Sequence, residues 1–384
     1  SITDPLLQGR YIYGDYVSGR IWSLNYNPST GAASSTLLFR TTGQFVSSFG
    51  LDEAGEMYFS DYGNSAQLYR LQGENSGPVT LPVDGVGNWG SPGNGTNGSV
   101  QALARSGDNE YYVGGQFTNA GGVSTPNLAV YGPSGWGTIG GANGQVLAIA
   151  VDENGGVYVG GDFSQIGGVP ANNIAYWDGA AWNALGAGTN GQVQAISIDE
   201  NNRVYAGGSF ETAGGSPANN SAYWENDSWS VLRNSGTGVD GTNNEIRVIE
   251  FDEAGNVYVG GNFDTAGGAT APRIAFWNGS SWASLGSGTS GFVQAITITP
   301  SSIYAGGNFA IAGGQTVNRI ARWVRAQSRW EPLNFGLSGN VNALEFDGTF
   351  LYAAGSFETA SNEADVNLIM NNVARWRTSG GWQA

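Results

Sequence analysis

Six copies of one short motif place a polar side chain between a pair of glycines and a phenylalanine. The clearest copy is YVGGDFSQIGG, which begins at Tyr158. Glycines let a ligand or another chain segment approach the backbone closely, so a polar side chain beside them is placed to exchange hydrogen bonds. We take the third position of GGxF (AGSF in the last copy) as the candidate ligand-binding position, which is occupied by Gln116, Asp162, Ser209, Asn262, Asn308 and Ser356.

The recurrence of the motif argues against a single phosphate-binding loop. Related copies begin at Tyr112, Tyr158, Tyr205, Tyr258, Tyr304 and Tyr352, at intervals of 46 to 53 residues. A phosphate site needs one glycine loop, whereas regular repetition at this period is typical of a repeated structural unit. The motif is therefore interpreted primarily as part of a repeated structural unit. A purely structural alternative is that each polar residue caps a backbone group of the neighbouring unit.

A second recurring pattern is a turn of the type DExG or DENN. An aspartate that opens such a turn can accept backbone hydrogen bonds, and the closing glycine or asparagine tolerates a left-handed backbone. Calcium is the alternative ligand for these carboxylates, but a calcium site needs more oxygen ligands than one turn presents. The weak calcium candidates are Asp52, Asp152, Asp199 and Asp252.

The composition removes several kinds of chemistry. The chain has no histidine or cysteine, and arginine supplies all 15 of its basic residues. Imidazole, thiolate and lysine-amine catalysis are therefore absent, and we expect a protein that is not an enzyme and has no cofactor. The 31 acidic residues give a net charge of -16. Such a charge disfavours nucleic acid, and no apolar run is long enough to insert in a membrane.

The elements that must position these residues are short strands. Each repeat contains four apolar or aromatic segments joined by turns, shown by VLAIAVD, VYVGGDF, NIAYWDG and AWNALG in residues 146–186. Four antiparallel strands at a period near 47 residues predict an all-β chain, a β-propeller of four-stranded blades. We expect eight blades by count, with seven as the alternative.

The chain is expected to form one propeller over residues 1–384. Residues 1–45 supply three strands of a partial blade without a recognisable innermost strand, residues 46–99 an irregular blade, and residues 100–384 six repeats of about 47 residues. Tryptophans recur on the third and fourth strands, and packing between blades explains them better than a sugar-binding platform. The missing strand of the partial blade could come from the C-terminal RWRTSGGWQA or from another copy of the chain.

Two stretches resemble known families. Residues 8–72, through GRYIYGDYVSGRIWSL and VSSFGLDEAGEMYFSDYGNSAQLYRL, are similar to the end of the pyrroloquinoline-quinone-dependent glucose/sorbosone dehydrogenases. That resemblance implies a propeller and export, but carries over no catalytic residue. Residues 100–384 resemble the YVGGxFxxAGG repeats of secreted bacterial proteins and of the kelch-like fungal cortical marker family, which implies binding or scaffolding roles outside the cell.

These observations favour a secreted or cell-surface binding or scaffold module whose partner is a carbohydrate or a surface protein. One alternative is a structural subunit of a surface fibre or layer that self-assembles through the open edge of the partial blade. Another is a relative of the quinone-dependent sugar dehydrogenases that lacks its catalytic part. The first residues have no signal-peptide pattern, so we expect the chain to begin inside a longer protein.

Overall fold

The computed structural model describes two kinds of segment. Strand backbone alone is described for residues 10–14, 20–26, 33–40, 46–51, 57–61, 68–72 and 88–90. Side chains are described for residues 94–106, 110–235, 238, 240–362, 368–370, 372–378 and 380–383. Within these ranges no helix has the length and apolar character needed to cross a membrane.

Each of the six repeats forms a four-stranded antiparallel sheet, in which the first strand of the repeat is innermost. These sheets comprise β8 (Ser99–Arg105), β9 (Tyr111–Gln116), β12 (Leu128–Gly132) and β13 (Gly135–Gly137); β14 (Gln145–Val151), β15 (Val157–Asp162), β18 (Ile174–Trp177) and β19 (Trp182–Ala184); β20 (Gln192–Ile198), β21 (Val204–Ser209), β24 (Ser221–Glu225) and β25 (Ser228–Val231); β26 (Ile246–Phe251), β27 (Val257–Gly261), β30 (Ile274–Trp277) and β31 (Trp282–Ser284); β32 (Val293–Ile298), β33 (Ser302–Gly307), β36 (Ile320–Val324) and β37 (Arg329–Pro332); and β38 (Val341–Phe346), β39 (Leu351–Gly355), β42 (Val373–Arg377) and β43 (Gly381–Gln383).

A short hairpin, made of two strands of two residues each, follows the second strand of every repeat. These hairpins are β10 (Asn119–Ala120) with β11 (Val123–Ser124), β16 (Gln165–Ile166) with β17 (Val169–Pro170), β22 (Thr212–Ala213) with β23 (Ser216–Pro217), β28 (Thr265–Ala266) with β29 (Ala269–Thr270), β34 (Ile311–Ala312) with β35 (Gln315–Thr316), and β40 (Thr359–Ala360) with β41 (Leu368–Ile369). Between β36 and β37 lies the 3₁₀ turn η1 (Arg325–Gln327).

The N-terminal strands form two more sheets. The four-stranded sheet contains β4 (Val46–Leu51), β5 (Met57–Asp61), β6 (Leu68–Gln72) and β7 (Asn88–Gly90), and the three-stranded sheet contains β1 (Arg10–Gly14), β2 (Arg20–Tyr26) and β3 (Ala33–Arg40). Strand β4 lies beside β39, and β5 lies beside β8, so this four-stranded sheet closes the ring between the last and the first repeat.

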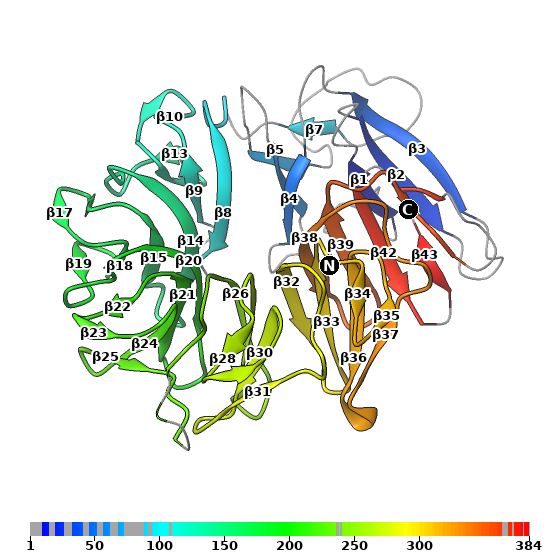
Figure 1. Cartoon of the computed structure of the whole chain (residues 1–384). Helices are drawn as coiled ribbons and strands as arrows, with labels where there is room; N and C mark the ends of the chain where they lie inside the picture. The colour runs from blue at the N-terminus through cyan, green and yellow to red at the C-terminus, as the bar shows by residue number, and fades with distance from the viewer. Residues whose placement is uncertain are drawn as a thin grey trace.

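The chain is a β-propeller, as the repeat period predicts (Figure 1). Among the described strands, seven sheets have four strands, and the eighth has three, with β1 beside β42 and β3 beside β7. The partial sheet therefore lies in the outer part of the junction between the sixth repeat and β4–β7. This sheet has one strand fewer than the other seven among the described strands.

The C-terminal segment does not complete the partial sheet. Strand β42 pairs with β39, and β43 pairs with β42, inside the sheet of the sixth repeat. In the partial sheet, β1 pairs only with β2 among the described strands. The suggestion that RWRTSGGWQA donates the missing strand within the chain is therefore wrong. Its residues continue the same four-strand pattern as every earlier repeat.

The two glycine pairs of the repeat have different physical roles. A Cβ atom built on Gly160 would lie 2.6 Å from Cγ1 of Val193 in the next sheet, and one on Gly161 would lie 2.0 Å from the carbonyl oxygen of Gln145. The first pair therefore allows close approach of strands and sheets. The second pair, Gly167 and Gly168, has φ values of 56° and 84°, so it supplies the left-handed turn of the hairpin.

The fourth-strand tryptophans join neighbouring sheets. The indole N–H of Trp282 donates to the carbonyl oxygen of Leu232 at 2.7 Å, and Trp330 donates to Leu285 at 2.8 Å. Both side chains are buried, and both carbonyls belong to the preceding repeat. The same bond recurs at Trp182, Trp229 and Trp382. Core packing is confirmed for the buried rings, because rings enclosed in this way have no face free to stack on a sugar.

We predict that Gly160→Ala destabilises the ring because its methyl group must displace Val193 of the next sheet. An overpacked core position costs roughly 1–3 kcal/mol in the free energy of unfolding, which equilibrium urea denaturation measures. The control is Gly132→Ala, whose methyl group meets only the flexible side chain of Glu110, with Cγ at 3.2 Å. Equal losses in the two variants would contradict the steric explanation.

Candidate functional site

The six candidate residues lie at the same end of their sheets. Gln116, Asp162 and Ser209 end the second strands and face the first residue of the innermost strand, as in the pairing of Ser209 with Gln192. Asn262, Asn308 and Ser356 directly follow β27, β33 and β39. We call this side of the ring the GGxF face. The prediction placed these residues at the end of an inner strand, and the structure places them on the second strand from the axis.

Most of the candidate side chains do not cap a neighbouring sheet. Asp162 accepts a hydrogen bond from the side chain of Gln192 in the next sheet at 2.9 Å. No side-chain hydrogen bond is found within the described ranges for Gln116, Ser209, Asn262, Asn308 or Ser356. Four of the six residues are exposed, and Asn262 and Asn308 are half-buried. Their polar groups are therefore accessible to a partner at this face.

Two equivalent hollows open on the GGxF face at successive sheet junctions. The Ser209 hollow, of 590 Å³, is lined by Ser209, Asn220, Thr242 and Asn243 among others. The Asp162 hollow, of 610 Å³, is lined by Asp162, Asn173, Thr189 and Asn190 among others. Both volumes lie within the range of about 300–1,000 Å³ that is usual for ligand pockets. The structure thus brings two candidate residues into matched hollows, which the other four do not line.

The walls of the hollows are held by asparagines with a left-handed backbone. Asn173 has a φ of 64°, and its side-chain oxygen accepts from the backbone N–H of Phe163 at 3.2 Å. Its amide group donates to the carbonyl oxygen of Thr189 in the next repeat at 2.9 Å. Asn220 repeats both bonds with Phe210 and Thr242. These side chains stabilise the turn before the third strand, and they also fasten successive sheets together.

A second set of asparagines was missed by the sequence reasoning. The side-chain oxygen of Asn190 accepts the backbone N–H groups of Glu211 and Thr212, each at 2.8 Å. Asn97, Asn143 and Asn243 form the same pair of bonds, and Ser290 and Ser338 form it with their hydroxyl oxygens. The signal in the sequence was the recurring Asn or Ser just before each innermost strand.

The aspartate turns lie on the opposite side of the ring. In Asp152, Oδ1 accepts from the backbone N–H groups of Asn154 and Gly156 at 2.9 and 2.8 Å. Asp199 and Asp252 form the same turn, while Asp52 lies outside the described residues. Within the described ranges, no three acidic residues gather in a way that could hold a metal ion. The carboxylates of these three residues act as turn acceptors.

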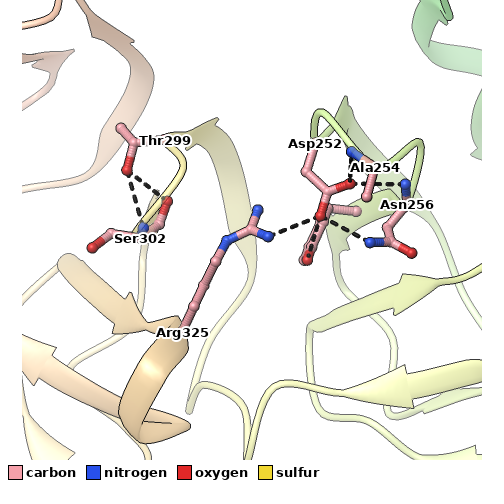
Figure 2. A network of polar contacts seen from close by, with 7 residues as sticks. Asp252, Ala254, Asn256, Thr299, Ser302 and Arg325 are labelled. Carbon is pink, nitrogen blue, oxygen red and sulfur yellow. Dashed lines mark hydrogen bonds and ion pairs between the residues drawn. The ribbon is translucent and has the colours of Figure 1, made fainter.

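Asp252 additionally joins two repeats (Figure 2). Its Oδ2 accepts from the guanidinium of Arg325 at 2.9 Å, from Asn256 at 2.9 Å and from the hydroxyl of Tyr258 at 3.1 Å. Burial opposes the charged form, but the donors from Asn256, Arg325 and Tyr258 outweigh it and lower the pKa of Asp252. The guanidinium supplies a positive charge beside this carboxylate.

We predict that a chelator leaves the stability of the protein unchanged. Thermal unfolding measured in excess EDTA and in excess calcium should give midpoints that differ by less than about 1 °C, because the described turn carboxylates already bind N–H and guanidinium donors. A clear rise in the midpoint with calcium would instead support a calcium site at one of the aspartate turns.

Two innermost strands carry glutamates toward the same region of the molecule. Glu250 lies in β26 and Glu345 in β38. Burial, followed by the nearby Glu345 carboxylate, raises the pKa of Glu250 to about 7. Partial desolvation also raises the pKa of Glu345, although its side chain remains exposed. Glu250 can therefore hold a proton at neutral pH, which no pattern in the sequence indicated.

The protonation of Glu250 predicts a pH dependence of stability. Because the pKa is higher in the folded than in the unfolded chain, the folded state binds more protons between pH 4.5 and 7, and the free energy of unfolding falls as the pH rises through this window. Glu250→Gln should remove this loss and stabilise the protein at pH 8 by up to about 3 kcal/mol. Urea denaturation at pH 5 and pH 8 tests this. Glu253→Gln, an exposed turn position, is the control and should leave the slope intact.

Comparisons with known proteins agree with the fold. Residues 136–250 match the family model described as the Rax2 C-terminal beta propeller domain. The computationally designed Ika8 protein has 15% sequence identity and a TM-score of 0.58, over 96% of this chain and 93% of that protein. The WD40 beta propeller domain of Doa1 has 11% identity and a TM-score of 0.50, over 87% of this chain and 96% of that domain. At these identities the structural similarities show the propeller fold alone.

Proposed function

We propose that this propeller is a non-catalytic binding or scaffold module, secreted or at the cell surface, that binds a carbohydrate or a surface protein through its GGxF face. The observation that carries the proposal is the pair of matched hollows at successive sheet junctions, each containing an accessible candidate residue. A propeller fold is compatible with such a role, although folds of this kind serve many functions.

The lining of the hollows suits a ligand with many hydroxyl or amide groups. Asparagine side chains offer both donors and acceptors, and threonine and serine hydroxyls can do either. Repetition of the hollow lets a polymer or a multi-domain surface protein engage two sites at once, which increases the overall affinity without any new kind of contact.

Two of the three carboxylates in these hollows support binding better than catalysis. Asp162 bonds to Gln192, and the buried Asp240 forms an ion pair with Arg233 at 2.6 Å. A general acid or base needs a carboxyl group that is free to exchange a proton with the substrate. Asp162 and Asp240 thus already have partners within the protein and are better suited to fixing the shape of the hollows. The third carboxylate, Glu211, is exposed at the Ser209 hollow and is available to a ligand.

A glycan array followed by calorimetry with the best ligand tests the proposal. Ser209→Trp fills one hollow without entering the core, so we expect the affinity to fall at least about tenfold. The matched control is Ser356→Trp, which makes the same change at the equivalent residue outside both hollows and should leave binding intact. Equal affinities for the two variants, or weakening in the control alone, would contradict a site at the hollows.

Self-assembly is a second candidate function, favoured by the three-stranded sheet. In this sheet β1 and β3 each pair only with β2 among the described strands. An unpaired strand edge can accept a strand from another chain. Light scattering over a range of protein concentrations should then show large assemblies. A constant monomer mass would contradict this role without affecting the ligand-binding proposal. The dehydrogenase-related alternative has support only from the resemblance of residues 8–72.

A further inference from the structure

A third cavity lies on the side of the ring opposite the GGxF face. It has a volume of 370 Å³ and opens between the sheets of the fifth and sixth repeats. Its lining includes Thr299, Ser302, Tyr304, Arg322, Trp376 and Arg377. We call it the Arg377 pocket. Its residues come from the ends of strands that point away from the GGxF face, so it is separate from the site proposed above.

At the Arg377 pocket, a neutral residue and two arginines stand where other repeats have acidic or uncharged residues. Thr299 stands at the turn position that is occupied by Asp152, Asp199, Asp252 and Asp347 in four other repeats. Its hydroxyl closes the shorter turn by bonding to Ser302 (Figure 2). The fifth repeat has therefore lost the acidic group that its neighbours keep at this end of the sheet.

Two arginines replace neutral or acidic residues at the same place. Arg322 lies opposite Tyr304 in the strand register, where three earlier repeats have two aromatic residues opposite each other. Arg377 follows the third-strand tryptophan, where those repeats have an acidic residue or asparagine. The corresponding pairs are Tyr158 with Tyr176, Tyr205 with Tyr223 and Tyr258 with Phe276, and the residues aligned with Arg377 are Asp178, Glu225 and Asn278. A scaffold role alone does not require these changes, because the other sheets pack without them.

The arginines retain unused hydrogen-bonding capacity. Arg322 donates from Nη2 to Glu331 at 2.6 Å and lies over the ring of Trp376 at 5.6 Å. The guanidinium of Arg377 lies near the ring of Phe350 and has no hydrogen bond or ion pair within the described ranges. The Nε atoms of Arg322 and Arg377 are buried without a partner in this part of the chain. The η-nitrogens of Arg377 are not buried, so they are the donors that an acceptor supplied from outside can reach.

The acidic groups nearby do not neutralise both arginines. Glu331 accepts from Arg322 and also from Arg329, and these bonds lower its pKa, so one carboxylate is shared between two guanidinium groups. The carboxylate of Asp347 accepts from the backbone of Thr349 and Phe350 and from the hydroxyl of Tyr352. Arg377 therefore gives the pocket a positive charge in a chain whose net charge is -16.

We propose that the Arg377 pocket binds a carboxylate-bearing sugar, such as a uronic acid residue of a polysaccharide. Guanidinium groups recognise carboxylates by charge-assisted hydrogen bonds. The exposed residues Ser301, Thr349 and Thr378 at the pocket add hydroxyls that can donate to and accept from sugar hydroxyls. This density of hydroxyl groups around one positive charge favours an acidic sugar over the acidic side chain of a peptide.

Calorimetric titration with an acidic and a neutral trisaccharide tests the proposal on the full chain. We expect trigalacturonate to bind, neutral galactotriose to bind at least about tenfold more weakly, and the affinity for trigalacturonate to fall as salt is added. Arg377→Gln removes the unpaired charge, and Thr299→Asp restores the acidic group of the other repeats. Each should weaken binding of trigalacturonate at least about tenfold.

The matched control is Arg329→Gln, because this exposed arginine shares Glu331 but does not line the pocket. It should bind trigalacturonate within about twofold of the unchanged protein. The proposal is overturned if the neutral trisaccharide binds equally well, if Arg377→Gln and Thr299→Asp both bind normally, or if a tetra-aspartate peptide binds while trigalacturonate does not. Circular dichroism of each variant establishes that a loss of binding is not a loss of fold. Loss of the Ser209 hollow alone should leave this titration unchanged.

Discussion

The ring depends on the close approach of each innermost strand to the sheet before it. Val193 packs where any side chain on Gly160 would stand, and the same arrangement joins Gly114 to Val146, Gly207 to Ile246 and Gly260 to Val293. Each glycine lets an aliphatic side chain of the next sheet pack directly on the strand, while tryptophans fill the wider outer part of each junction. The glycine at the inside and the indole at the outside together set the wedge shape that lets the sheets close into a ring.

Much of this architecture could be predicted because it repeats. The period, the four strands, the aspartate turns and the packing role of the tryptophans each recur in the sequence with a direct physical meaning. The hydrogen bonds of Asn97, Asn143, Asn190 and Asn243 to their hairpins, which we call the asparagine clamps, were harder to predict. An Asn before a strand has no partner until the hairpin of the same repeat folds beside it. The bond between Asp252 and Arg325 joins residues 73 positions apart, so local pattern carries no sign of it. The accessible position of the GGxF residues on the second strand also follows only from the pairing register.

The two sides of the ring differ in how closely they follow the repeat. On the GGxF face, the asparagine clamps and the asparagines with a left-handed backbone recur from repeat to repeat. The Asp162 and Ser209 hollows are therefore similar. At the opposite side, the turn at Thr299 and the arginines at 322 and 377 depart from the pattern in adjacent repeats. Departures that cluster in space, at positions where the regular residue also packs well, indicate that something other than folding determines the residue type. Ala354 also departs from the pattern, at the close-approach position where the sixth repeat lies beside β4 and not beside another repeat.

The hydrogen bonds of Asn190 and Trp229 suggest where repeats of this kind can be added or removed during evolution. Asn190 fastens a repeat to its own hairpin, whereas Trp229 fastens that repeat to the one before it. A gene segment that begins at Asn190 encodes both partners of the bond between this asparagine and its hairpin. It also encodes the tryptophan that bonds to the preceding repeat. Duplicating or deleting that segment leaves every fastening matched with a partner. A break between Asn190 and Glu211 would separate this side chain from its hairpin, whereas a change by whole repeats leaves the bonds within each repeat the same.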